Sequence, residues 1–127
     1  MKRVIVVSPY RGNWLRRLGH RAYARHAVRD SLLRGEAPLA GHLLYPQRGI
    51  LREHIPAERG MGIEACAAWI ELADEVAVYA DYGVSEGMQN DIGVARSCQI
   101  PVVFRHIISE APDDEAHGLF RAFKRGL

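Results

Sequence analysis

The sequence lacks any uninterrupted apolar run of about 18 residues, the length that a membrane-spanning helix needs. Its start, "MKRVIVVS", also lacks the long apolar segment and the small-residue cleavage site of a secretory leader. We therefore expect a cytoplasmic protein without a membrane partner. With 127 residues, of which 48% are hydrophobic and 25% charged, the chain falls in the ordinary globular range. We expect one domain spanning residues 1–127.

Cysteine is scarce, and the usual metal and phosphate motifs are missing. The two cysteines, Cys66 and Cys98, form no Cys-x-x-Cys pair, which favours buried, reduced thiols over a disulfide or a zinc site. The six histidines show no His-x-x-x-His spacing. Neither a Walker loop nor a GxGxxG fingerprint is present. The sequence therefore implies no metal ion and no other cofactor.

The net charge of +2 is small but unevenly distributed. Arginines crowd residues 11–34, at Arg11, Arg16, Arg17, Arg21, Arg25, Arg29 and Arg34. This bias favours an anionic ligand, either a phosphate or a nucleic acid backbone. However, Arg21, Arg25 and Arg29 repeat every four residues and are most simply a solvated stripe on one helix face. With this small charge and no recognisable binding motif, a nucleic acid is the less favoured partner.

Strand-like and helix-like segments alternate along the chain. Valine-rich runs at residues 3–8, 75–80 and 101–107 are typical of strands buried on both faces, and residues 38–46 read as a short strand. Helical spacing covers residues 19–36, 58–74, 85–98 and 116–126, and residues 47–56 give little periodic signal. This alternation predicts an α/β fold, a flavodoxin-like (Rossmann-like) doubly wound parallel sheet of four to five strands.

Two further expectations follow from this fold class. Ligands of such sheets bind outside the carboxyl ends of the strands, where the strand order reverses. Asp74 and Glu75 lie at the amino end of the strand over residues 75–80, so we expect them at the opposite edge of the sheet in structural roles. The helix over residues 58–74 is apolar on several sides and needs more cover than its own sheet gives. We therefore expect a homodimer or a higher homo-oligomer.

The loop after the first strand, "SPYRG", contains a candidate phosphate contact. Its glycine, Gly12, lets the backbone approach an anion closely, and Arg11 supplies a forked set of donors that matches phosphate. Ser8 and Tyr10 precede this pair. A plain turn with a surface arginine explains the local sequence equally well.

The loop over residues 83–95, "GVSEGMQNDIGVA", is the second candidate. If Ser85 caps the helix, its hydroxyl and the N–H groups of Glu86, Gly87 and Met88 converge on an anion site. Asp91 follows in the second helical turn, where a carboxylate could attack or stabilise an anomeric carbon beside a bound phosphate sugar. Helix capping by a serine and acidic residues is the simpler alternative.

Residues 69–104, "WIELADEVAVYADYGVSEGMQNDIGVARSCQIPVVF", resemble the core of the nucleoside 2-deoxyribosyltransferase superfamily, particularly its nucleoside 5'-monophosphate N-glycosidases. "SPYRG" resembles that family's first ligand loop, so the resemblance covers about residues 3–104 of one domain of this type. Small uncharacterised proteins of bacteria and phages share the "SPYRG" and "GM..DI" signatures. The resemblance implies that Ser85 and Gly87 contact phosphate and that Asp91 stands at the catalytic glutamate.

The sequence departs from the family's pattern at two positions. Asp91 is one methylene shorter than the family's glutamate, and attack geometry tolerates little misplacement. Cys66 stands where the family usually has an aspartate that assists proton transfer to the base. Glu64, Asp81 or Glu86 are the carboxylates that could compensate.

The resemblance implies a cleavage of the base–sugar bond through a carboxylate nucleophile, by hydrolysis or by transfer to a second base. The catalytic set would be Asp91, Glu86 and Tyr10, and the binding set Ser8, Arg11, Gly12, His42, Asp81, Ser85, Gly87 and Met88. The alternative is a non-catalytic nucleotide-binding or regulatory protein that keeps the pocket.

Overall fold

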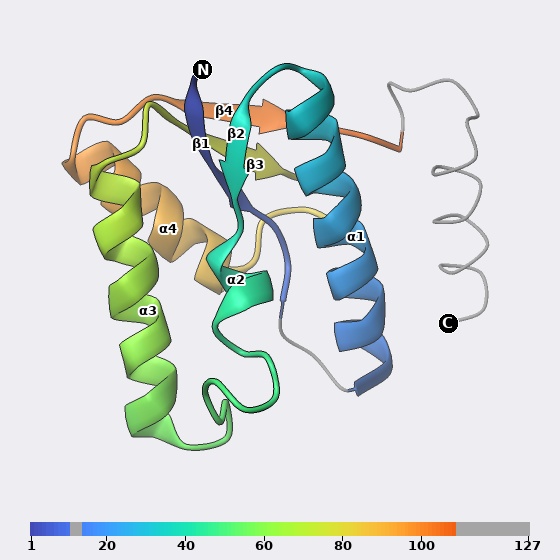
Figure 1. Cartoon of the computed structure of the whole chain (residues 1–127), viewed down its shortest axis with the longest axis vertical. Helices are drawn as coiled ribbons and strands as arrows, with labels where there is room; N and C mark the ends of the chain where they lie inside the picture. The colour runs from blue at the N-terminus through green and yellow to red at the C-terminus, as the bar shows by residue number, and fades with distance from the viewer. Residues whose placement is uncertain (11–13, 109–127) are drawn as a thin grey trace.

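The computed structural model describes residues 1–10 and 14–108 (Figure 1). In chain order its elements are β1 (Arg3–Val7), α1 (Trp14–Leu33), β2 (Ala37–Leu39), α2 (Gly41–Leu44), α3 (Pro56–Glu71), β3 (Glu75–Tyr79), α4 (Glu86–Ser97) and β4 (Val102–Arg105). The helix predicted over residues 116–126 lies outside the described residues. None of the helices in the described part of the chain combines the length and apolar character needed to cross a membrane.

The strands described here form one sheet in the order β2-β1-β3-β4, and every neighbouring pair is parallel. The chain moves outward from β1 to β2, returns to β3 on the other side of β1, and continues outward to β4. The order therefore reverses between β1 and β3. This confirms the predicted flavodoxin-like, doubly wound α/β fold.

Helices cover both faces of the sheet, with α1 on one side and α3 and α4 on the other (Figure 1). Side chains of successive strand residues point to opposite faces. Val4 and Val6 therefore pack with Tyr23 of α1, whereas Val7 packs with Ile70 of α3 and with α4. Burial on both faces explains why the valine runs are continuous rather than alternating.

Two element boundaries differ from the prediction. The strand expected over residues 38–46 ends at Leu39, and Gly41–Leu44 forms the short helix α2. A brief apolar run fits a strand or a helical turn equally well, and here the turn packs Leu43 against the core. Helix α1 begins at Trp14, five residues before the predicted start at Gly19. A single interior glycine weakens a helix without ending it.

Asp74 and Glu75 lie at the amino edge of the sheet, as predicted, and both make contacts there with basic residues. The N–H of Arg3 donates to Asp74 at 2.7 Å, and Lys2 pairs with Glu75 at 3.2 Å.

A buried ion pair joins β4 to the segment before β2. The guanidinium of Arg105 donates to both oxygens of Glu36, at 2.8 and 2.7 Å. Hydrogen bonds from the charged guanidinium of Arg105 hold the pKa of Glu36 below its usual range. These ion-paired side chains stabilise the sheet, and they lie away from the carboxyl ends of β1 and β2.

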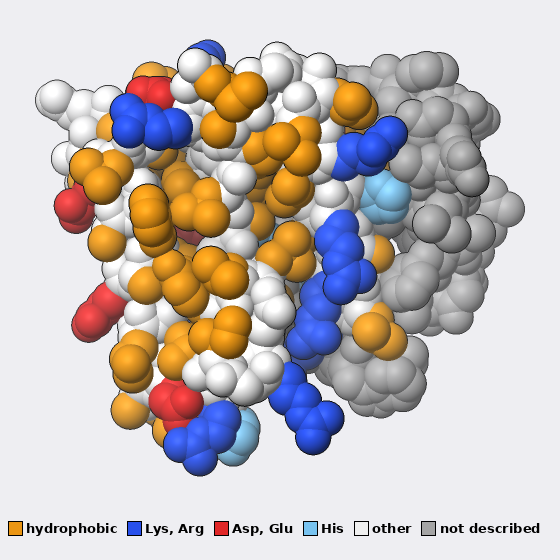
Figure 2. Space-filling view, in the orientation of Figure 1, with side chains coloured by type: hydrophobic (Ala, Val, Ile, Leu, Met, Phe, Trp, Pro, Cys, Tyr) orange, Lys and Arg blue, Asp and Glu red, His pale blue; other side chains and the backbone are white. Residues whose placement is uncertain are grey.

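The face shown in Figure 2 carries a basic column and an apolar area. Lys and Arg side chains form a column over α1, and Arg25 and Arg29 are exposed, in agreement with the predicted solvated stripe. Hydrophobic side chains gather on the α3 side of the same view. The large exposed members on α3 and at its end are Met61, Ile63, Trp69 and Leu72.

Candidate functional site

A cavity of about 570 Å³ opens at the carboxyl ends of β1 and β2 and at the amino end of α4. This volume lies within the usual range for small-molecule sites. Its lining residues are Ser8 and Tyr10 after β1; Gly41, His42, Tyr45 and Pro46 after β2; Glu53, Arg59, Gly62, Ile63 and Cys66 from the next loop and α3; and Ser85, Glu86, Gly87, Met88, Asn90 and Asp91. The cavity therefore lies at the reversal of strand order, where ligands of this fold class bind.

The structure gathers most of the predicted site residues around this cavity. Those that line it are Ser8, Tyr10, His42, Ser85, Glu86, Gly87, Met88 and Asp91. Arg11 and Gly12 lie outside the described residues. Asp81 is the predicted residue that the structure does not bring to the lining.

The side chain of Asp81, on the α1 side of the sheet, joins α1 and the segment after β4 to the end of β3. Its carboxylate accepts a hydrogen bond from the Tyr23 hydroxyl and from the N–H groups of Ile107 and Ile108, at 3.0 and 3.1 Å. Burial and the bond to Asp81 raise the pKa of Tyr23, so this phenol stays protonated. The structure thus gives Asp81 a role in tying the end of β3 to the segment after β4, in place of the predicted ligand contact.

The amino end of α4 is a capped helix start that borders the cavity. Ser85 is the N-cap: the N–H of Met88 donates to its Oγ at 3.3 Å, and its own N–H faces the Met88 sulfur at 3.4 Å. Met88 is buried and anchors this turn under the helix. The N–H of Met88 is therefore used by the cap, contrary to the prediction. The N–H groups of Glu86 and Gly87 remain without intrahelical acceptors, as at any helix start.

Asp91 is a half-buried carboxylate in the second turn of α4. It lies between the buried positions Met88 and Ile92, at the edge of the helix face that packs on the sheet, and it lines the cavity. Burial raises the pKa of Asp91 from the usual 3.8 to about 6. At neutral pH this side chain is mostly an anion that water solvates poorly. Perturbed carboxyls of this kind, placed in a cleft, are typical of catalytic sites.

Ser8 and His42 form a hydrogen-bonded pair on the opposite wall. Ser8 Oγ and His42 Nε2 lie 2.6 Å apart, joining the end of β1 to α2. Burial, together with the neighbouring His20, lowers the pKa of His42 to about 4. The imidazole is therefore neutral at pH 7, and it can offer a hydrogen bond to a sugar or a base.

Cys66 lies between α2 and α4 within the cavity wall. A Cβ added at Gly41 would overlap its sulfur, so the glycine permits this close approach. Burial, the charge of Asp91 and the charge of Glu53 raise the pKa of the Cys66 thiol to about 11. Cys66 is thus a neutral, half-buried group, and both it and Cys98 are free thiols.

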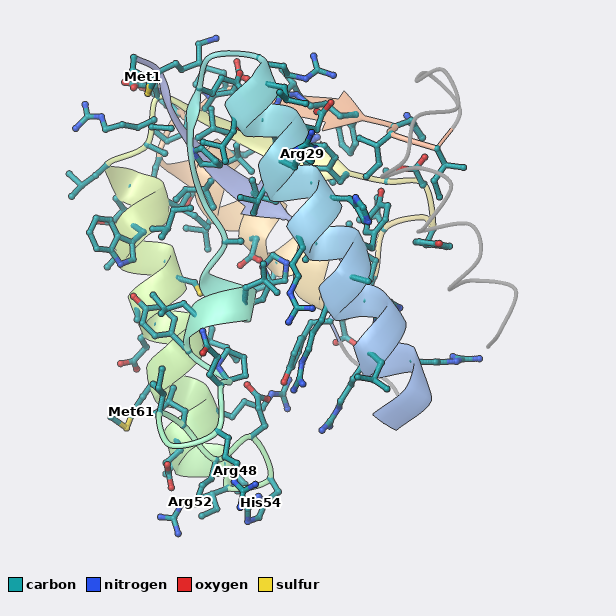
Figure 3. The ribbon with its side chains drawn as sticks, turned by 45° about the vertical axis from the view of Figure 1, so that its right-hand side comes forward. Met1, Arg29, Arg48, Arg52, His54 and Met61 are labelled. Carbon is teal, nitrogen blue, oxygen red and sulfur yellow. The ribbon has the colours of Figure 1, made fainter. Side chains whose placement is uncertain are left out.

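Sequence reasoning missed three lining residues: Tyr45 at the end of α2, Glu53 in the irregular loop and Arg59 in the first turn of α3. The loop is held by Arg52, whose Nε donates to Glu58 at 2.7 Å. Figure 3 shows Arg48, Arg52 and His54 together at the end of this loop, on the same side as the start of α3. No periodic signal in residues 47–56 could have placed this segment against the cavity.

The fold is shared with a solved 2-deoxyribosyltransferase from Bacillus psychrosaccharolyticus. The alignment has a TM-score of 0.59 and 17% sequence identity, and it covers 87% of this chain and 77% of that one. At this identity the likeness establishes the fold alone. The chain belongs to a family described as a domain of unknown function, DUF7768, whose model matches residues 2–105. No curated protein matches the sequence.

Replacing Asp91 by asparagine is expected to stabilise the protein above pH 6. A carboxyl whose pKa is raised in the folded state makes unfolding easier as the pH rises from 3.8 to about 6. Removing the charge should therefore raise the free energy of unfolding by about 2–3 kcal/mol at pH 7 and far less at pH 4. Urea unfolding at both pH values measures this change in the free energy of unfolding.

The control is Glu71→Gln, a change at an exposed carboxylate of α3, which should alter the free energy of unfolding by less than about 0.5 kcal/mol. Equal stability of Asp91→Asn and wild type at pH 7 would contradict the partial burial of the Asp91 carboxyl.

Proposed function

We propose that the protein is a nucleoside 5'-monophosphate N-glycosidase or a deoxyribosyltransferase-like enzyme. The observation that carries this proposal is the position of Asp91, a carboxylate of raised pKa, beside the open amino end of α4 in one cavity. A phosphate on the Glu86 and Gly87 N–H groups would hold the sugar near this carboxylate. The fold shared with a 2-deoxyribosyltransferase and the sequence resemblance support the same chemistry.

The reaction would proceed in two displacements at the anomeric carbon. An Asp91 oxygen attacks that carbon, the bond to the base nitrogen breaks, and the base leaves with the electron pair and takes up a proton. Water or a second base then attacks the same carbon and releases the Asp91 carboxylate. Water gives a hydrolase and a second base gives a transferase. The poorly solvated carboxylate stabilises the oxocarbenium-like charge in both steps.

The remaining residues would bind and orient the nucleotide. Arg11 and Gly12 would complete the phosphate site, and Tyr10 and the neutral His42 would contact the sugar or the base. Ser8 orients His42 through the 2.6 Å bond.

Glu53 is the carboxylate best placed to assist proton transfer to the base. It lines the cavity, and its charge acts on Cys66, the residue at the position of the family's aspartate. Of the carboxylates considered from the sequence, Asp81 is engaged elsewhere and Glu64 is exposed outside the lining. Glu86 lines the cavity but is exposed at the helix start.

Incubation with nucleoside and deoxynucleoside 5'-monophosphates should release free base, measured by chromatography. Asp91→Asn should lower the rate by more than about 10³-fold, because the nucleophile is lost. The wild-type rate should rise about tenfold per pH unit below 6 and level off above 7, because the carboxylate must be ionised.

The control for this assay is Glu71→Gln, which should retain the wild-type rate. Glu53→Gln should lower kcat by about 10²-fold or more if Glu53 assists the proton transfer. Base release that persists in Asp91→Asn would remove Asp91 from the mechanism. Ligands that raise the thermal midpoint but are recovered unaltered would favour the non-catalytic, nucleotide-binding alternative.

We also propose that the protein is a homodimer that buries the exposed apolar face of α3. Met61, Trp69 and Leu72 are exposed by 59%, 48% and 66%, a grouping that monomeric proteins rarely leave in water. Ile63 belongs both to this face and to the cavity lining. The second subunit would therefore lie next to the site.

Sedimentation velocity over a range of concentrations tests the dimer. Met61→Glu and Leu72→Glu should each weaken association at least tenfold, because a charge would be buried in the interface. Leu33→Glu, the same kind of change at an exposed position of α1, should leave association as in wild type. Sedimentation of the wild type as a monomer at every concentration would refute the proposal.

A further inference from the structure

Tyr45 is a cavity-lining residue that is packed between α2 and α3, two helices that lie side by side (Figure 1). It is the C-cap of α2, and its N–H donates to the carbonyl oxygen of Gly41 at 2.9 Å. Its side chain lies against two glycines. A Cβ added at Gly41 would lie 3.5 Å from the edge of the Tyr45 ring, and one added at Gly62 of α3 would lie 3.8 Å from the Tyr45 Cβ. The ring is therefore confined by both helices.

The hydroxyl of Tyr45 is held by an exposed residue of α3. It accepts a hydrogen bond of 2.8 Å from the indole N–H of Trp69. Trp69 lies about two turns after Gly62 on the same helix face, and helical side chains tilt toward the amino end, so the indole reaches back to Tyr45. Trp69 is 48% exposed and is not among the described residues that line the cavity. The polar end of Tyr45 is therefore directed away from the cavity, and its ring carbons line it.

The neighbours of Tyr45 in the lining are apolar. Pro46 follows it directly, and Ile63 lies next to Gly62 on α3. We call Tyr45, Pro46 and Ile63 the apolar wall. The carboxylate of Asp91 and the start of α4 line the same cavity from a different helix. This combination is complementary to a ligand that joins an anionic group to a flat, unsaturated ring, because such a ring stacks on an aromatic side chain.

We propose that the ring of Tyr45 is the surface on which the base of the nucleotide stacks, and that Trp69 is a positioning residue that fixes this ring. A ring that is fixed before the ligand arrives loses less conformational freedom on binding, so the hydrogen bond from Trp69 raises affinity without touching the ligand. The identity of the stacked ring as a nucleobase rests on the proposed function, whereas the fixed aromatic surface does not.

Calorimetry on the full chain tests the stacking surface, with every variant made in Asp91→Asn so that no ligand is consumed. Nucleoside and deoxynucleoside 5'-monophosphates are each compared with the sugar 5-phosphate that lacks the base. The best-bound nucleotide should bind about tenfold or more tightly than its sugar phosphate, and Tyr45→Ala should weaken the nucleotide alone by about fivefold or more. A smaller difference between the two ligands, or equal weakening of both by Tyr45→Ala, would overturn the stacking surface.

A double-mutant cycle in the same background tests the positioning role of Trp69. Trp69→Phe and Tyr45→Phe remove the two ends of one hydrogen bond and keep both aromatic side chains. Each should weaken nucleotide binding about threefold or more, and the double variant should match the single variants within about twofold. Binding of the sugar phosphate should not change. Trp69→Phe alters an exposed position, so it carries the test if Tyr45→Ala fails to fold.

The matched control is Glu71→Gln, an exposed position of α3 close to Trp69, which should bind the nucleotide as the Asp91→Asn background does. Weakening by Trp69→Phe that is less than about threefold relative to Glu71→Gln would overturn the positioning role, and so would additive effects of Trp69→Phe and Tyr45→Phe.

The base-release assay, with Asp91 intact, separates this inference from the proposed function. Trp69→Phe should raise KM by about threefold or more and leave kcat within about twofold, because Asp91 and the start of α4 are unchanged. A lower kcat at unchanged KM would overturn the positioning role. If no nucleotide loses its base but nucleotide binding depends on Tyr45 and Trp69, the proposed function fails and the stacking surface stands.

Discussion

The pairing of β1 with β3 as adjacent parallel strands is the constraint on which the rest of the structure depends. Val4 to Val7 pair in register with Glu75 to Val78, and the connections on the two sides of this pair run in opposite directions. The loops after both strands therefore turn away from each other and leave a cavity at their carboxyl ends. Ser8 and Tyr10 reach it from one strand, and the capped start of α4 reaches it from the other.

The charges around the cavity are divided between its walls. Asp91 on α4 is a half-buried anion whose pKa is raised by partial burial alone, with no cation paired to it. Elsewhere the lining holds a neutral imidazole, His42, and Tyr10, whose ring faces the guanidinium of Arg17. The folded structure thus contains a partly desolvated carboxylate at Asp91 and two unpartnered nitrogen atoms on α1, Arg17 Nε and His20 Nδ1. Proteins carry such costs at functional sites, where a ligand supplies the missing partners.

Much of the fold and part of the site could be predicted from the sequence. Continuous valine runs identify buried parallel strands, and Ser85 ahead of an amphipathic segment identifies the start of α4. Helix α2 could not be distinguished from a strand, because a run as short as residues 41–44 fits both periods. Glu53 and Arg59 reach the cavity only through the tertiary path of residues 47–56, which have no local pattern.

Asp81 shows how a residue at the correct end of a strand can still lie outside the cavity lining. It follows β3 at the carboxyl end of the sheet, where ligands bind, yet its side chain lies on the same face as Tyr79, two residues earlier. Residues two apart on an extended chain share a face, and this face is covered by α1 through Tyr23. The unpartnered atoms of Arg17 and His20 depend likewise on how α1 packs, which no spacing in the sequence reveals.

The central claim is that Asp91 is a half-buried, unpaired carboxylate that is ready to act as a nucleophile. Its side-chain carboxyl carbon can be followed by NMR in a ¹³C-labelled sample titrated from about pH 3 to pH 8. The structure predicts a midpoint of about 6 for this carboxyl. A midpoint near the ordinary 3.8 would contradict the account, because Asp91 would then be solvated or paired like any surface aspartate.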